Sequence, residues 1–133
     1  MVLRVDLRDL FGGLAAPDGP RVEVEGRALR SVEAFRASHT RGEAWTLSAG
    51  DRIPAHFHKG IDDVFVGVRG EGTVTTWGTD GEASSERLGE GCIVVVGAGT
   101  PHMVTCGTGF VSYVLIQSPP EHDDFEVFGG PVG

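Results

Sequence analysis

Three of the five histidines in this chain stand in a pattern that restricts how it can fold. His56 and His58 are separated by one residue, and on a strand this spacing directs both imidazoles to one face. A straight strand would carry Asp63 roughly 16 Å beyond His58, but a turn at Gly60 would fold it back beside the histidines. His102 comes from a distant part of the sequence. Three imidazoles and one carboxylate that meet at one point make a site for a first-row transition metal, with coordination positions left open.

Glycines around these residues complete two motifs. The residues of the first motif are Gly50, His56, His58, Asp63 and Gly70. The residues of the second motif are Gly91, Gly97, Gly99 and His102. Their spacing resembles the two motifs of the cupin family, and the resemblance extends over residues 42–117. It implies an all-β fold, the cupin double-stranded β-helix or jelly-roll barrel.

The resemblance also implies the ligands of a divalent transition metal, which are His56, His58, Asp63 and His102. The metal would be Fe, Mn, Ni, Co or Zn, since the spacing does not select among them. The family carboxylate is usually Glu, and an Asp side chain is one methylene shorter. Asp63 is therefore expected to bind the metal directly or through water, to orient a histidine, or to act as a general base beside three histidine ligands. Asp62 is a rival ligand, but the count of residues to Gly70 favours Asp63.

Strand alternation indicates which further residues face this site. Phe65, Gly67 and Arg69 are expected to share a face with Asp63. Phe65 would line the pocket, and Gly67, which has no side chain, would leave space in it. The fork of Arg69 matches a substrate carboxylate, with a local acid as its alternative partner. Cys106, at a position where the family usually has Asn, is expected to pack in the core. The candidate substrate-binding residues are Trp45, Phe65, Arg69 and Tyr113. Of these, Trp45 and Tyr113 could instead belong to the core.

Composition and charge exclude several classes of partner. The net charge of −8 argues against nucleic acid and against anionic membrane surfaces. No apolar run approaches ~20 residues, so the sequence predicts no membrane span. The N-terminus has no signal-peptide pattern, and Cys92 and Cys106 have no redox or metal-binding spacing. A cytoplasmic location is therefore expected. His39 and His122 lie in polar segments and are expected to have no ligand role.

The sequence predicts a single cupin domain over residues 1–133, because it contains no internal repeat. The barrel core is expected at 42–117, with N-terminal strands at 1–41 and a C-terminal tail at 118–133. Residues 1–14 predict a strand followed by a short helical turn, although a helical stripe also fits. A turn is expected at 69–72, and a polar, solvated segment ends at Glu90. Alternation and turn signals predict further strands at 21–25, 28–35, 44–49, 53–58, 63–69, 73–78, 92–96, 103–106 and 110–117.

The continuous apolar run at 92–96 predicts a strand that is buried on both faces. The face of the strand at 63–69 that points away from Asp63 carries Val64, Val66 and Val68. Together with this run, these valines would support a second layer of structure. In similar cupins such a sheet often packs against a partner subunit, so the resemblance implies a homodimer.

These features predict a metal-dependent cupin enzyme that acts on a small organic substrate inside the barrel. We favour a dioxygenase, which needs a redox metal, over a Lewis-acid isomerase, cyclase or lyase. Asp63 is the candidate catalytic residue, because its carboxylate would move a proton. The alternative is a non-catalytic small-molecule-binding module. Sensors of that kind usually carry an attached DNA-binding or signalling domain, and residues 1–41 contain no recognisable helix-turn-helix.

Overall fold

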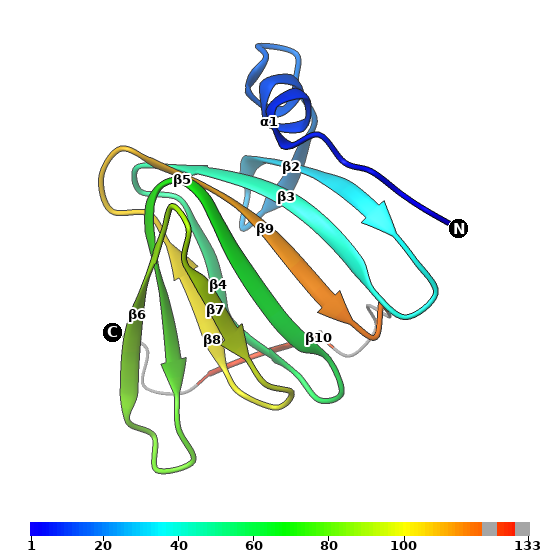
Figure 1. Cartoon of the computed structure of the whole chain (residues 1–133). Coiled ribbons are helices and arrows are strands. Elements are labelled where there is room, and N and C mark those ends of the chain that lie inside the picture. Colours follow the sequence, from blue (N-terminus) through cyan, green and yellow to red (C-terminus); the bar gives the residue numbers. More distant parts are fainter. Residues whose placement is uncertain (121–124, 130–133) are drawn as a thin grey trace.

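The computed structural model describes residues 1–120 and 125–129. Figure 1 shows the strands of this part of the chain as a curled sheet, with a helix at one end. The helix is α1 (Leu7–Ala15), and the strands are β1 (Arg21–Val24), β2 (Arg27–Arg36), β3 (Arg41–Ser48), β4 (Arg52–His58), β5 (Asp62–Trp77), β6 (Ala83–Gly89), β7 (Ile93–Val96), β8 (His102–Thr105), β9 (Phe110–Ser118) and β10 (Phe125–Val127). In the described part of the chain the strands pair antiparallel, in the order β1-β2-β3-β9-β5-β8-β4-β10, and β6 and β7 also pair with β5. The all-β prediction is confirmed.

Strand β5 joins the two halves of the sheet, because it is 16 residues long and pairs with four other strands. Its register with β9 shifts between Gly67 and Arg69, so that Val68 is an extra residue in the ladder. A bulge of this kind reverses which side chains face inward. Before the bulge an odd-numbered residue, Phe65, is buried. After the bulge an even-numbered residue, Val74, is buried. The turn predicted at 69–72 is wrong, since the strand continues through it.

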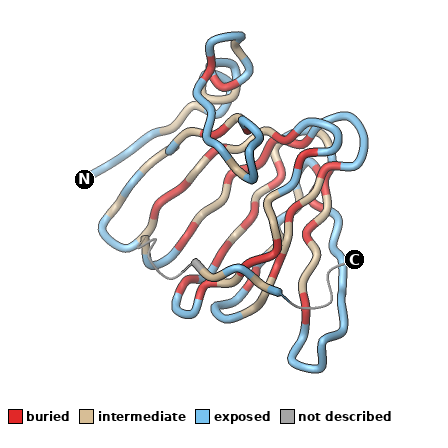
Figure 2. The backbone as a smooth tube through the Cα atoms, turned by 180° about the vertical axis from the view of Figure 1, so that it is seen from behind, coloured by how far each residue is buried: buried red, intermediate tan, exposed pale blue. Residues whose placement is uncertain are grey.

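The core lies inside the curl, where alternate side chains of each strand face one another. Figure 2 shows that buried residues recur along the strands, whereas most of α1 is exposed or half-buried. Burial of apolar side chains on one face of an antiparallel sheet is what drives such a sheet to curl around a core. Cys106 packs there, as expected. The buried members of this core are Leu29, Leu47, Phe65, Val74, Leu88, Val96, Val104, Cys106, Val111 and Tyr113.

The N-terminal segment forms a helix, without the strand that was expected before it. Asp6 caps α1, since its side chain accepts a hydrogen bond from the backbone N–H of Asp9 at 3.0 Å. Leu14 is buried, and α1 contacts β2 and β3. The helical stripe of apolar residues therefore overrides the short alternating pattern. The strand predicted within residues 1–14 is wrong, and the strands predicted at 21–25 and 28–35 are present as β1 and β2.

Two further segments differ from the sequence prediction. The segment before Glu90 is exposed over most of its length, as expected, but it also forms a strand that was not predicted, β6, which pairs with the second half of β5. Strand β7 is not buried on both faces, because Ile93 and Val95 are each 66% exposed whereas Val96 is buried. The other predicted strands are present with shifted ends.

The predicted C-terminal tail contributes a strand. Strand β10 pairs with β4, and the Phe128 ring packs on Trp77 with centroids 5.3 Å apart. His122 lies outside the described residues. Within the described chain, no helix has the length and apolar character needed to span a membrane.

Candidate metal centre

Four buried side chains meet inside the curled sheet. Each of His56, His58, Asp63 and His102 offers one ligand atom, and these atoms lie within 4.8 Å of one another. Strand β4 supplies the first two histidines, and β8 pairs with β4 so that His102 stands opposite His56. The short connection between β4 and β5 returns Asp63 to the same point. The sequence prediction named these four residues as the metal ligands, and the structure brings all four together.

Hydrogen bonds to backbone carbonyls set the tautomers of two of the histidines. The Nδ1 atom of His56 lies 2.7 Å from the Pro54 carbonyl oxygen, and Nδ1 of His102 lies 2.9 Å from that of Thr100. Because a carbonyl oxygen can only accept, Nδ1 must carry the proton in both rings. Each Nε2 atom therefore presents a lone pair, which is the form that a metal ion binds.

The Nε2 atom of His102 is buried and has no hydrogen-bond partner in the described part of the chain. It lies 2.9 Å from Oδ2 of Asp63, and Nε2 of His58 lies 3.7 Å from the same oxygen. With the proton on Nδ1, a lone pair of His102 faces a carboxylate oxygen. Such a pair is repulsive unless a cation or a proton lies between the two atoms. Two nitrogen lone pairs and a carboxylate oxygen around one point fit a divalent transition metal.

The charge state of His56 also suits a ligand. Burial, together with the neighbouring His102, lowers the pKa of His56 from 6.5 to about 4. The imidazole of His56 is therefore neutral at neutral pH, so no proton has to be displaced before it binds a metal ion.

A buried chain of hydrogen bonds fixes the orientation of Asp63. The side-chain amide of Gln117 donates from Nε2 to Oδ1 of Asp63 at 2.9 Å. Arg41 donates in turn to Oε1 of Gln117, from Nε at 3.0 Å and also from Nη2. All three residues are at most 5% exposed. One carboxylate oxygen is therefore engaged by Gln117, while the other is directed at the histidines.

Sequence reasoning missed Arg41 and Gln117. Both stand at positions that pair directly in the sheet: Arg41 lies opposite Gln117 between β3 and β9, and Asp63 lies opposite Gln117 between β5 and β9. A signal was present, because Gln117 continues the inward-facing series of Val111 and Tyr113 with a polar residue. A buried amide at such a position needs a partner.

A cavity of about 420 Å³ opens beside the four ligands. Three of the predicted substrate-binding residues, Trp45, Phe65 and Tyr113, line it. The Phe65 ring lies 5.9 Å from the His102 ring and 5.7 Å from the Tyr113 ring, measured between centroids. Burial raises the pKa of Tyr113 above its ordinary value, so its phenol is neutral. The cavity therefore has an aromatic wall next to the metal ligands.

Two predicted pocket residues lie elsewhere. Arg69 is exposed and lines a different cavity, because the bulge at Val68 turns it to the outer side of the sheet. The expectation that Arg69 shares a face with Asp63 is therefore wrong. Gly67 leaves no open space, since a Cβ atom there would lie 1.9 Å from the backbone oxygen of Gly89.

Asp62, the rival to Asp63, is not a member of the cluster. Its side chain is exposed at the start of β5, and its Oδ1 accepts a hydrogen bond from the backbone N–H of Ala98 at 2.8 Å. Asp62 thus fastens the loop that leads to His102, while Asp63 points inward.

Solved structures share this fold at low sequence identity. TT1209 from Thermus thermophilus is 21% identical with a TM-score of 0.61, over 68% of this chain and 83% of that chain. Bacillus subtilis oxalate decarboxylase, in a structure concerned with its Mn(II) centres, is 17% identical with a TM-score of 0.65, over 81% of this chain and 29% of that one. DMSP lyase DddQ from Ruegeria pomeroyi DSS-3 is 15% identical with a TM-score of 0.65, over 79% of this chain and 54% of that one. At these identities the likeness shows the fold alone.

Sequence comparison identifies the family of the chain. No curated protein sequence matches the chain. A family model described as a cupin domain matches residues 43–115, which is more than half of the 133 residues. With this match and the shared fold, the chain belongs to the cupin family.

Proposed function

We propose that this protein is a metal-dependent enzyme that acts on a small organic molecule in the cavity beside His56, His58, Asp63 and His102. The observation that carries the proposal is the buried, unpartnered Nε2 atom of His102, which faces Oδ2 of Asp63 at 2.9 Å. Burying a neutral polar group without a hydrogen-bond partner costs on the order of 2–7 kcal/mol. A bound Fe, Mn, Ni, Co or Zn ion would compensate both atoms and would supply Lewis acidity or redox chemistry.

The walls of the cavity indicate the kind of substrate. Trp45, Phe65 and Tyr113 supply flat apolar surface that would hold the organic body and exclude water from the reacting atoms. The charged residues that line the same cavity, apart from the ligand histidines, are Glu23, Glu25, Glu43 and Arg41. Glu43 pairs with Arg41 and Glu25 pairs with Arg52, so the lining carries little net charge, which favours an uncharged substrate over a dianion. Since Arg69 faces the other side of the sheet, it does not provide the predicted carboxylate recognition.

Among reaction classes we favour a dioxygenase, with a Lewis-acid isomerase, cyclase or lyase as the second candidate. The aromatic, apolar wall supports the first, because it protects a reactive organic intermediate from water. Asp63 is the proposed catalytic residue: its Oδ1 is held by Gln117, so that only Oδ2 is directed at the reacting centre to bind the metal or to move a proton. The non-catalytic binding module remains the alternative from another class.

The proposal is tested first by the metal content of untagged protein that is purified without chelator and reconstituted with single metals. We expect near-stoichiometric binding of one transition metal, and we expect His58→Ala to lower the occupancy sharply. His39→Ala is the matched control, because its ring is not in the ligand cluster. Full occupancy in His58→Ala would contradict the assigned site.

The identity of the metal then selects the assay. Iron, manganese or nickel leads to oxygen-uptake measurements with enolic, catecholic and thiol substrates, whereas zinc alone favours isomerisation or cyclisation. Absence of metal after every reconstitution would contradict the hypothesis of a metal-dependent enzyme and would favour the non-catalytic binding module. The proposal also includes the cytoplasmic location and the homodimer expected from the sequence, without nucleic acid or membrane partners.

A further inference from the structure

A second cavity lies between helix α1 and the outer side of the sheet, with a volume of about 490 Å³. We call it the helix slot; α1 and residues of β2, β3, β5 and β9 line it. It is separate from the metal centre. Thr46 and Ser112 line the helix slot, whereas their neighbours Trp45 and Tyr113 line the metal cavity. Adjacent residues of a strand face opposite sides, so the sheet itself divides the two cavities.

The lining of the helix slot carries positive charge only. Its charged residues are Arg8, Arg30 and Arg69, and no Asp or Glu lines it, although the chain has 19 acidic and 11 basic residues. Arg30 is fixed, because its Nη1 donates to the carbonyl oxygens of Leu14 at 2.6 Å and Ala16 at 2.7 Å. In the described chain, Arg8 and Arg69 have no ion-pair partner.

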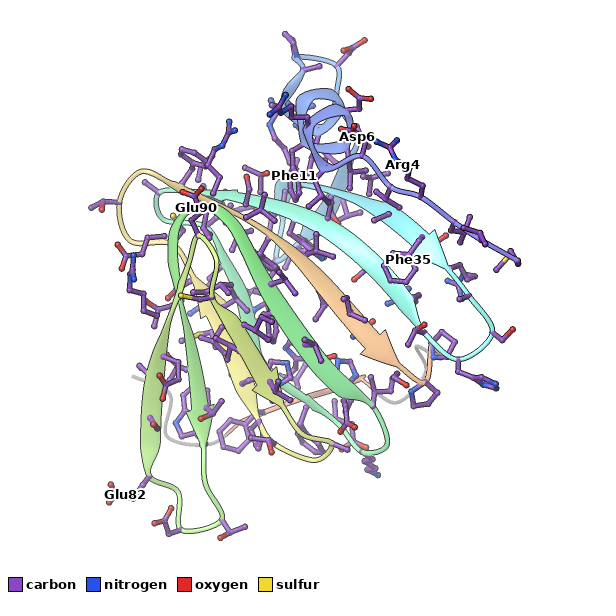
Figure 3. All side chains as sticks on the ribbon, in the orientation of Figure 1. Arg4, Asp6, Phe11, Phe35, Glu82 and Glu90 are labelled. Carbon is purple, nitrogen blue, oxygen red and sulfur yellow. The ribbon has the colours of Figure 1, made fainter. Side chains whose placement is uncertain are left out.

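The rest of the lining is apolar with a small polar patch. Phe11 of α1 lies on the side of the helix that faces the sheet, as Figure 3 shows, and Phe110 and Val68 line the slot from the sheet. On the sheet the hydroxyls of Thr46 and Ser112 lie 2.9 Å apart and hydrogen-bond to each other. Small-molecule pockets typically combine about 300–1,000 Å³ of mostly apolar space with a few polar groups, and the helix slot has this character.

We propose that the helix slot binds a small amphipathic anion, that is, an apolar aromatic or acyl body that carries one carboxylate or phosphate group. Phe11 and Phe110 would contact the apolar body. The anionic group would lie between Arg8 and Arg69, whose forked donors match carboxylate and phosphate oxygens. The bulge at Val68, which turns Arg69 away from the metal cavity, is what brings this charge into the slot.

Gly12 allows the slot to be filled without disturbing the helix. It lines the slot, and a Cβ atom built there would meet nothing within 4 Å. A leucine at this position would therefore project into open space, and it has a higher helix propensity than glycine. Gly13 is the matched control, because its Cβ position is equally open and it does not line the slot.

The test measures fluorescence binding of anilinonaphthalene sulfonate, an amphipathic anion, and of the uncharged N-phenyl-naphthylamine. We expect saturable, one-to-one binding of the sulfonate. Gly12→Leu should weaken it at least 10-fold, and Gly13→Leu should leave it unchanged. Arg8→Gln and Arg69→Gln should each weaken the sulfonate but not the uncharged probe, while Arg36→Gln, outside the slot, should weaken neither. Binding should persist in His58→Ala, which keeps it distinguishable from ligand binding at the metal centre.

Four outcomes would overturn the proposal. Unchanged sulfonate binding in Gly12→Leu would place the probe elsewhere, and equal loss in Gly13→Leu would trace the effect to the helix as a whole. Unchanged sulfonate binding in both Arg8→Gln and Arg69→Gln would remove the anionic requirement. If Gly12→Leu instead dissociates a dimer in analytical ultracentrifugation, the occupant of the slot is a second copy of the chain and not a small anion.

Discussion

At the scale of single residues, the orientation of Asp63 is the most consequential feature of the metal centre. A free aspartate side chain could present either oxygen to the histidines, and it is shorter than the usual glutamate of the family. Gln117 removes this freedom by engaging Oδ1, and Arg41 fixes the amide of Gln117 from behind. A positioned carboxylate loses less conformational entropy when it binds a metal ion than a mobile one does.

Gln117→Leu tests this role directly. The substitution leaves Oδ1 of Asp63 and the guanidinium of Arg41 buried without their present partner, so we expect metal affinity to fall about 10- to 100-fold. Affinity is measured by competition with a chelator of known strength, and folding of the metal-free variant by circular dichroism. Ser112→Ala is the control, because Ser112 lies on the same strand and lines the helix slot instead. Equal affinity in Gln117→Leu and the wild type would show that Asp63 needs no such support.

Which residues could be predicted follows from what fixes their positions. His56, His58 and His102 were predictable because a two-residue spacing and a paired second motif leave few other arrangements. Arg41 and Gln117 were not, since their contact with Asp63 depends on the register of β3, β9 and β5, which a single sequence does not specify.

At the scale of elements, strand β5 shows how glycine misleads sequence interpretation. Gly70 and Gly72 predicted a turn, but they stand where strands approach each other closely. A Cβ atom at Gly70 would lie 2.1 Å from the Phe110 carbonyl oxygen, and one at Gly72 would lie 2.9 Å from that of Thr105. Glycine in a strand marks either a break or a close approach, and only the structure distinguishes them. The same ambiguity concealed the bulge at Val68, and with it the true side of Arg69.

Gly67→Ala measures the cost of one such approach. Its Cβ atom would meet the backbone of Gly89, which cannot move aside as the end of a flexible side chain could. We expect the free energy of unfolding to fall by about 1–3 kcal/mol, the usual range for overpacking. Chemical denaturation measures this change. Gly107→Ala is the control, since a Cβ atom there meets nothing within 4 Å; a loss of the same size in both variants would refute the steric cause.

At the scale of the whole molecule, the apolar run around β7 links the sequence to assembly. Continuous hydrophobicity predicted burial on both faces of β7, yet the described residues of the chain cover only one of them. Ile93 and Val95 are each 66% exposed, and they pair across the ladder with Val66 and Val64, which are half-buried. Directly paired residues share a face, so the four side chains form one apolar strip on the outside of the sheet. A partner subunit that covers this strip would restore the burial that the sequence predicted.

The strip therefore assigns the surface through which the expected homodimer would form. In a two-fold dimer the same patch meets itself, so one charge introduced into the strip is repeated across the interface and repels its copy. We expect the wild type to sediment as a dimer and Val95→Glu to sediment as a monomer at the same concentration. Val127→Glu is the matched control, because Val127 is also a highly exposed valine, on β10 and outside the strip. A monomeric wild type would refute the dimer. A Val127→Glu variant that dissociates as fully as Val95→Glu would instead move the interface away from β7, and the exposure of Ile93 and Val95 would then have to be explained by a different partner.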